Sequence, residues 1–164
     1  MSRLAAKLAW RETAEPADIA RVGALVEATG FFTPEEIAIA RELVEERHAK
    51  GAASGYEFYF AEWHGALLGY ACYGRTPGTE HSWDLYWIVV APASQGEGLG
   101  REILARIEPK IRAGAGRILW ADTSSTARYA PTRAFYLRAG FHEAARLTNF
   151  YRPGDDKVIY EKRL

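Results

Sequence analysis

A glycine-rich segment between an apolar strand and a helix is the part of the chain whose residues point most directly to chemistry. Residues 85–90 are apolar and rich in strand formers, and Ile103, Leu104 and Ile107 follow at helical spacing. A strand that passes through glycines into a helix surrounds an anion with backbone N–H groups and a positive helix end, and glycines let the anion approach closely. The pattern predicts a phosphate or diphosphate site over Gln95, Gly96, Glu97, Gly98, Leu99, Gly100 and Arg101.

Two commoner glycine motifs do not fit this segment. A dinucleotide-binding fingerprint that starts at Gly96 would need glycine where Arg101 stands, and a P-loop would need Lys followed by Ser or Thr. The pattern that fits is Gln/Arg-x-x-Gly-x-Gly/Ala, met by Gln95, Gly98 and Gly100. Taken alone, the segment is equally compatible with a plain strand–helix turn that binds nothing.

A second motif lies one predicted strand further along. Tyr136, Gly140 and Phe141 form Tyr-x-x-x-Gly-Phe, in which the glycine suits a left-handed helix end and the phenylalanine begins the next strand. Together with the first motif, which follows a strand ending Val90-Ala91-Pro92, this resembles the GNAT superfamily of acyl-CoA-dependent N-acetyltransferases. The two motifs stand in the order and at the spacing of that family.

The order of the predicted elements agrees with the resemblance across the whole chain, and the fold class is α+β. Capping signals start helices at Glu15 and at Thr33, where Glu36 completes a capping box, and Gly51 ends the second helix. Two further helices are expected at 98–113 and 131–139, and strands at 8–12, 56–63, 66–74, 82–90, 117–122, 141–151 and 157–162. The resemblance implies one GNAT domain over residues 1–164. It also implies a mixed, mostly antiparallel sheet of about seven strands with splayed fourth and fifth strands, flanked by about four helices.

Composition excludes several function classes. The 21 basic and 21 acidic residues cancel, so no global field favours nucleic acid or an anionic membrane. No apolar run reaches the ~20 residues of a membrane span, and Arg3 and Lys7 interrupt any signal-peptide core in residues 1–8. Cys72 is the only cysteine, which fits a reducing cytoplasm.

The resemblance implies how the co-substrate acetyl-CoA is held. In the family the pantetheine arm lies beside the fourth strand and pairs with its backbone, and by position Ile88, Val89 and Val90 supply those groups. The loop from Gly96 to Arg101 then holds the diphosphate. Residue type alone would favour a tyrosine ring packed under the sheet at position 136, but Tyr136 matches the family's tyrosine that gives a proton to the departing thiolate.

Two aspartates match family positions for a general base, directly or through a water molecule. Asp84 lies on the fourth predicted strand and Asp122 ends the fifth. Asp84 could instead make a structural hydrogen bond to neighbouring backbone, and Asp122 could instead cap the turn that follows it. Glu80 and His81 are weaker candidates that we expect to be solvated.

The remaining reactive side chains carry no predicted role. Cys72 lies in an apolar strand with no activating histidine in evidence, so it is expected to be a core residue rather than a nucleophile. The four histidines lack the spacing of metal ligands, and no metal is expected.

The acceptor amine is the least determined part of the prediction. The leading hypothesis is acetyl transfer by direct attack of a primary amine, with a small-molecule or amino-acid-like acceptor. A protein N-terminus or lysine remains an alternative, as does a non-catalytic acyl-CoA-binding or sensing domain, and a homodimer is an open alternative to a monomer. The acceptor entrance would be bordered by Phe31, Phe32, Tyr151, Arg152, Asp155 and Asp156, with Tyr59, Tyr73 and Tyr86 below; the two aspartates are expected to form a solvated hairpin turn.

Overall fold

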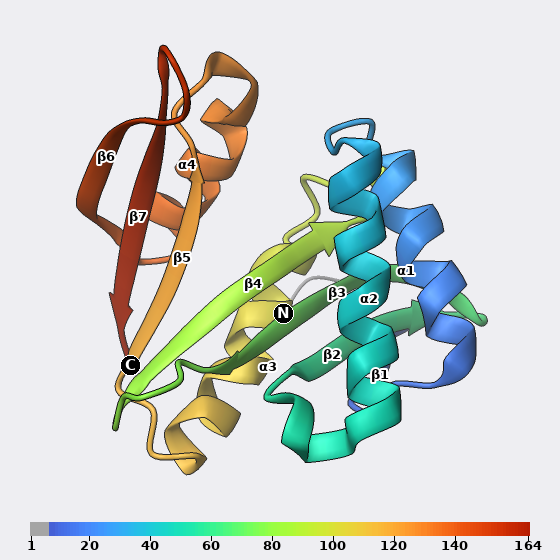
Figure 1. Cartoon of the computed structure of the whole chain (residues 1–164). Coiled ribbons are helices and arrows are strands. Elements are labelled where there is room, and N and C mark those ends of the chain that lie inside the picture. The colour runs from blue at the N-terminus through green and yellow to red at the C-terminus, as the bar shows by residue number, and fades with distance from the viewer. Residues whose placement is uncertain (1–6) are drawn as a thin grey trace. The chain divides into compact units, whose positions relative to one another are not determined.

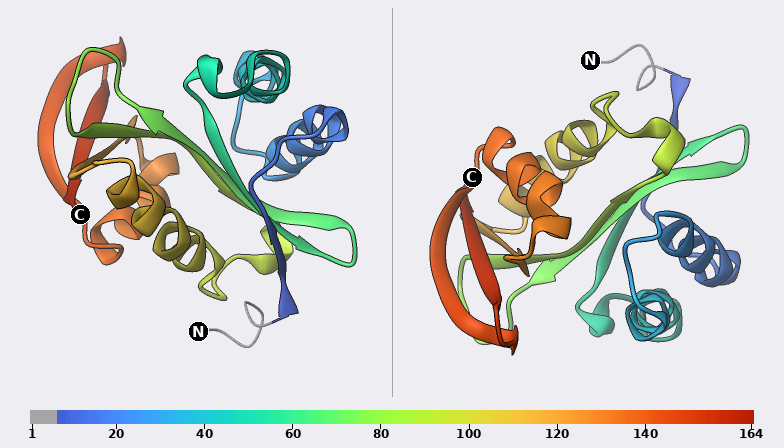
Figure 2. Two further views of the ribbon diagram at one scale, coloured as in Figure 1. Left: turned by 90° about the horizontal axis from the view of Figure 1, so that it is seen from below. Right: turned by 90° about the horizontal axis from the view of Figure 1, so that it is seen from above.

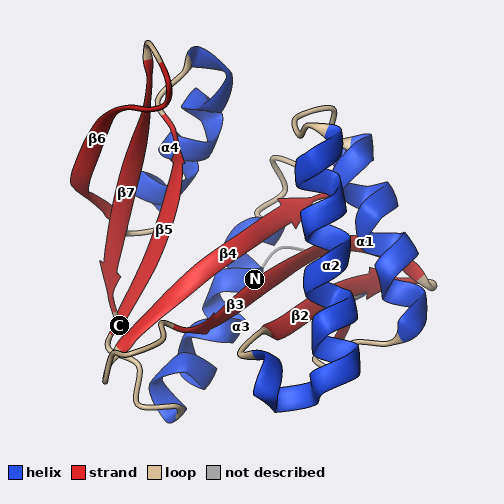
Figure 3. Ribbon diagram, in the orientation of Figure 1, coloured by secondary structure: helices blue, strands red, loops and turns tan. Residues whose placement is uncertain are grey.

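The computed structural model describes residues 7–164, so the expectation for residues 1–8 falls mostly outside the described residues. Figure 1 labels the elements in chain order and Figure 3 separates helices from strands. The helices are α1 (Pro16–Ala28), α2 (Pro34–Lys50), α3 (Leu99–Ala113) and α4 (Ala130–Arg138). The strands are β1 (Ala9–Arg11), β2 (Glu57–Trp63), β3 (Ala66–Arg75), β4 (Ser82–Val90), β5 (Ile118–Ser124), β6 (His142–Arg152) and β7 (Asp155–Arg163).

The strands form one seven-stranded sheet in the order β1-β2-β3-β4-β5-β7-β6. The β1–β2, β2–β3, β5–β7 and β6–β7 pairs are antiparallel, whereas β4 and β5 are parallel. The parallel register joins only Ser82–Asp84 to Ile118–Trp120, although both strands continue beyond it. The predicted mixed, mostly antiparallel sheet is confirmed, and the pairing of the fourth and fifth strands is limited to the first three residues of each.

The chain divides into two compact units, and β4 contributes residues to both. The first unit holds residues up to Gly74 together with Tyr86–Lys110. Within it, α1 and α2 lie side by side on one face of β2 and β3, and α3 lies on the other face (Figure 2). The core under α1 and α2 is formed by buried residues of both helices and of β2, β3 and β4: Val22, Leu25, Val26, Ala40, Val44, Phe58, Phe60, Tyr70, Cys72 and Val89.

The second unit comprises Arg75–Leu85 and Ile111–Leu164. Its strands β5, β7 and β6 carry α4 against one face (Figure 2). Tyr136 of α4, Phe141 and Tyr160 of β7 are buried and pack ring against ring. All residues of β6 are exposed, and this strand forms the end of the sheet.

Local sequence signals account for most of the element boundaries. The predicted capping box of α2 is present, since the Thr33 amide donates to Glu36 Oε2 (2.8 Å) and the Glu36 amide donates to Thr33 Oγ1 (3.2 Å). His64 and Gly65 both have positive φ (46° and 79°), which is the backbone that a tight β2–β3 hairpin requires. Two strand boundaries differ by two residues from those expected: β5 continues past Asp122 to Ser124, and β7 starts at Asp155.

A buried ion network fixes the start of α1 to the sheet. Asp18 is completely buried and accepts hydrogen bonds from Arg11 (2.7 and 2.8 Å), Arg21 (3.0 Å) and the Glu15 amide (2.8 Å). Burial disfavours the carboxylate and acts to raise its pKa, but the Arg11 and Glu15 hydrogen bonds and the two arginine charges outweigh burial. The pKa of Asp18 therefore lies below its ordinary 3.8.

This network predicts a loss of stability in acid. A depressed folded-state pKa contributes stability that is complete above the unfolded pKa of about 3.9 and is lost as the pH falls through the folded value. Asp18→Asn should therefore lower the free energy of unfolding at pH 7 by about 3 kcal/mol, because it removes the buried carboxylate and leaves two partly buried arginines with Glu62 alone, and by less below pH 3. Urea unfolding at both pH values measures this. Glu46→Gln, which breaks an exposed pair with Lys50, is the matched control and should change stability little at either pH. An equal loss for Asp18→Asn at both pH values would contradict the assignment.

Candidate functional site

The glycine-rich loop leaves β4 through a 3-10 turn at Pro92–Ser94 and enters α3 at Leu99. Gly96 and Gly98 have φ of 79° and 84°, a conformation that side chains with a Cβ rarely adopt. A Cβ added at either glycine would meet nothing within 4 Å, so the conformation, not crowding inside the protein, calls for glycine. Residues 95–98 are exposed, and the loop presents open backbone on its outer side.

Both ends of this loop are anchored. The Ala91 amide donates to the Leu68 carbonyl (2.8 Å), and the Gln95 side-chain amide donates to the Val90 carbonyl (3.1 Å). At the other end, Leu99 and Ile103 are buried. The first amides of an α-helix have no intrahelical acceptor, and they carry the positive end of the helix dipole. The segment is therefore a rigid concentration of hydrogen-bond donors suited to an anion.

The strand that precedes the loop is tightly supported by β3. Val89 is buried, whereas Ile88 and Val90 are half-buried. A Cβ on Gly69 would lie 3.0 Å from the Val89 carbonyl oxygen and 3.1 Å from Ile103 Cδ1. Glycine at position 69 therefore lets β3 approach both the end of β4 and the first turns of α3.

Tyr136 lies inside the second unit, in an aromatic cluster. Its ring centroid is 5.2 Å from that of Phe141 and 5.4 Å from that of Tyr160. Burial, and then the negative charge of Asp122, raise the pKa of Tyr136 well above the ordinary 10, so the phenol stays protonated at neutral pH. The Tyr-x-x-x-Gly-Phe motif has the predicted local structure: Gly140 has φ 89°, and the Phe141 amide donates to the Tyr136 carbonyl (3.0 Å) at the helix end.

The two candidate bases have different surroundings, and both are in the second unit. Asp84 accepts a hydrogen bond from the Thr76 hydroxyl (2.6 Å). The structural alternative to a catalytic role had predicted a hydrogen bond to neighbouring backbone, and this partner is a side chain instead. Asp122 is 44% exposed and forms an ion pair with Lys157 Nζ (2.5 Å) on β7. The structural alternative to a catalytic role had predicted that Asp122 caps the turn after β5.

The structure also places Cys72 and the three tyrosines that were expected below the acceptor entrance. Cys72 is completely buried, and burial raises its pKa, as expected of a core residue. Tyr59 and Tyr73 are buried, whereas Tyr86 is 38% exposed. Within residues 7–164 no group of three or more His, Cys, Asp or Glu side chains could hold a metal ion. In the same residues no helix is long and apolar enough to cross a membrane.

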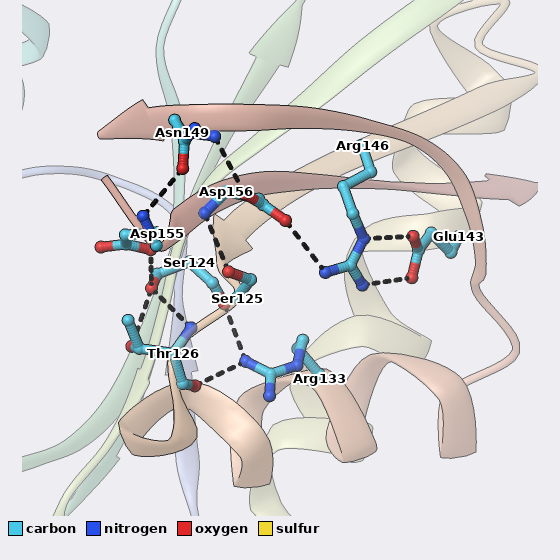
Figure 4. A network of polar contacts seen from close by, with 10 residues as sticks. Ser124, Ser125, Thr126, Arg133, Glu143, Arg146, Asn149, Asp155 and Asp156 are labelled. Carbon is cyan, nitrogen blue, oxygen red and sulfur yellow. Dashed lines mark hydrogen bonds and ion pairs between the residues drawn. The ribbon is translucent and has the colours of Figure 1, made fainter. Parts of the chain in front are cut away.

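The expectation that Asp155 lies in a solvated turn is wrong. Asp155 is 4% exposed and accepts the Ser124 hydroxyl (2.5 Å). Asp156 is also engaged, since its amide donates to Ser125 Oγ (2.8 Å) and its carboxylate accepts the Asn149 amide (2.9 Å). Figure 4 shows these contacts joining the end of β5 to the β6–β7 hairpin. The run of hydroxyl residues at 123–126 was the available sequence signal for this network.

Comparison with known proteins places this geometry in a family. The acetyltransferase (GNAT) domain profile matches residues 54–143. A crystal structure of a protein assigned to the GNAT family from Desulfovibrio desulfuricans is 52% identical, covers 95% of this chain and 98% of its own, and superposes with a TM-score of 0.93. No curated protein sequence matches the chain.

More distant solved structures share the fold. An aminoglycoside 6'-N-acetyltransferase complexed with coenzyme A is 18% identical over 94% of this chain and 96% of its own, with a TM-score of 0.77. The ribosomal-protein-S18-alanine N-acetyltransferase of Escherichia coli is 19% identical over 95% and 93%, with a TM-score of 0.73. The profile match and the 52% identical relative show that this chain belongs to the GNAT family and is an acetyl-CoA-dependent acyltransferase.

Proposed function

We propose that this protein transfers the acetyl group of acetyl-CoA to a primary amine by direct attack, and that the acceptor is a small molecule or amino-acid-like. The observation that carries the proposal is the anchored loop 95–98, whose two left-handed glycines present open backbone at the start of α3. In the family this segment holds the diphosphate of the donor.

The proposal assigns the contacts with acetyl-CoA to residues of the first unit. The backbone of Ile88, Val89 and Val90 pairs with the pantetheine arm, and a backbone N–H of the same strand stabilises the oxyanion that forms during attack. The amides of Gln95, Gly96, Glu97, Gly98, Leu99, Gly100 and Arg101 surround the diphosphate. The close packing of this strand against Gly69 supports these roles, because an oxyanion donor acts best when it is held in place beforehand.

The proposal gives Tyr136 the role of general acid. A thiolate with the acidity of a cysteine, near ~8.5, is a better leaving group when a proton is delivered to its sulfur. The raised pKa of Tyr136 supports this role, because the phenol carries its proton throughout the neutral range. Direct attack needs no protein nucleophile, which agrees with the burial of Cys72.

Of the two candidate bases, we favour Asp122, acting on the amine directly or through water. Its charge acts on Tyr136, and its carboxylate is 44% exposed although it pairs with Lys157; the carboxylate of Asp84 is half-buried and accepts the Thr76 hydroxyl. Asp122→Asn should lower kcat by about 100-fold, within the usual range for a lost general base, and Asp84→Asn by less than about threefold. The two substitutions make the same chemical change, so each is a control for the other. Steady-state kinetics at saturating acetyl-CoA decide, and the reverse ranking would transfer the role to Asp84.

The acceptor class is tested by competition. Balanced charge gives no sign of a surface for a long basic peptide. Purified protein and acetyl-CoA are mixed with equal concentrations of small primary amines, free amino acids, N-terminal peptides and lysine peptides, and acetylated products are identified by mass spectrometry. We expect acetylated small amines or amino acids to appear first. Preferential peptide acetylation would support the protein-acetyltransferase alternative, and acetyl-CoA binding without any product would support a sensing domain.

A further inference from the structure

We propose that Arg133 is a positioning residue for catalysis, which holds α4 against the end of β5 and so fixes the place of the Tyr136 phenol. The inference rests on the proposed function of Tyr136. Arg133 Nη1 donates to the carbonyl oxygens of Ser124 and Thr126, each at 2.8 Å, and Figure 4 shows the side chain reaching from the helix to this turn.

The start of α4 needs such an anchor. The helix has only nine residues, and its N-cap residue, Tyr129, makes no side-chain capping bond. A helix this short is marginal by itself and depends on tertiary contacts. Arg133 lies three residues before Tyr136, so the two side chains project from neighbouring positions on one helix face. If the start of α4 is released, the helix can shift against the sheet, and such a shift would displace the Tyr136 ring.

The turn that receives Arg133 is itself fixed by side chains. The Ser124 hydroxyl accepts the Thr126 amide (3.1 Å) and donates to the buried carboxylate of Asp155 (2.5 Å). Ser125 Oγ accepts the Asp156 amide (2.8 Å), which ties the same turn to β7. Arg133 thus connects α4 to a fixed point of the sheet rather than to a free loop.

The consequence is specific to the chemical step. The residues assigned to acetyl-CoA lie in the first unit, whereas Arg133, Tyr136 and the turn all lie in the second. Loss of the anchor should impair proton transfer, which requires a heavy-atom approach of about 3 Å, and should leave donor binding unchanged. A purely structural defect would lower the melting temperature and would not depend on whether Tyr136 is present.

A double-mutant cycle tests this dependence. Arg133→Met removes both hydrogen bonds and keeps an unbranched apolar stem, and Arg138→Met, at the exposed last residue of the same helix, is the matched control. Arg133→Met should lower kcat by about tenfold with the KM for acetyl-CoA within about twofold, but should lower kcat less than about twofold in the Tyr136→Phe background. Arg138→Met should leave kcat unchanged in both backgrounds.

The outcomes separate the inference from the function on which it rests. An equal proportional loss of kcat in both backgrounds, or no loss in wild type, would overturn the positioning role. If Tyr136→Phe alone leaves kcat unchanged, the role of Tyr136 fails instead, and any effect of Arg133→Met then has another origin. Arg133→Lys keeps a cation whose single nitrogen can donate to these carbonyls, as Arg133 Nη1 does, but on a shorter side chain, so it should restore part of kcat. It also carries the test if Arg133→Met does not fold.

Discussion

Gly98→Asp is expected to weaken acetyl-CoA binding by at least about 100-fold, the equivalent of about 2.7 kcal/mol. The substitution places a side chain at φ 84°, which costs about 1–2 kcal/mol for an L-residue. It also sets a carboxylate among the amides that we assign to the donor diphosphate, so like charges repel where the anion would bind. Calorimetric titration of acetyl-CoA into wild type and variant measures the difference.

Gly78→Asp is the matched control for this experiment. Gly78 has nearly the same backbone conformation, φ 74°, and an added Cβ there also meets nothing within 4 Å. The strain and the new charge are therefore alike, and only the place in the fold differs. Gly78→Asp should bind acetyl-CoA as wild type does, and similar weakening in both variants would mean that backbone strain, not the diphosphate site, explains the effect.

Tyr136→Phe is expected to lower kcat by about 100-fold with little change in the KM for acetyl-CoA, because it removes only the proton donor. The ring stays, so the contacts with Phe141 and Tyr160 and the thermal stability should persist. Since burial raises the pKa of Tyr136, no alkaline loss of kcat from this group is expected below pH 10 in wild type. Steady-state kinetics across pH check both points.

A kcat for Tyr136→Phe within about twofold of wild type would remove the general-acid role. Phe135→Leu is a suitable control, since Phe135 neighbours Tyr136 on the same helix and contacts its ring (centroids 5.6 Å apart) without bearing a hydroxyl. It should affect stability more than kcat.

The features that were predictable from the sequence are those fixed by neighbouring residues. The α2 capping box and the left-handed helix end at Gly140 each depend on a few consecutive residues. The order of such elements was therefore readable without knowledge of their packing.

The features that sequence reasoning missed depend on partners far along the chain. The local sequence predicts that Asp155 is a turn residue. It is buried instead, and its carboxylate accepts a hydrogen bond from Ser124, 31 residues earlier, across the β5–β7 pairing. Asp122 pairs with Lys157 for the same reason. The register between two strands sets these contacts, and neither strand carries that register in its own residues.

The crystal structure of the protein with coenzyme A tests the central claim most directly. The account predicts diphosphate oxygens at ~2.7–3.2 Å from backbone nitrogens of the segment Gln95–Arg101, with the pantetheine arm along residues 88–90. Coenzyme A bound elsewhere, with the loop at 95–98 still open to solvent, would contradict it.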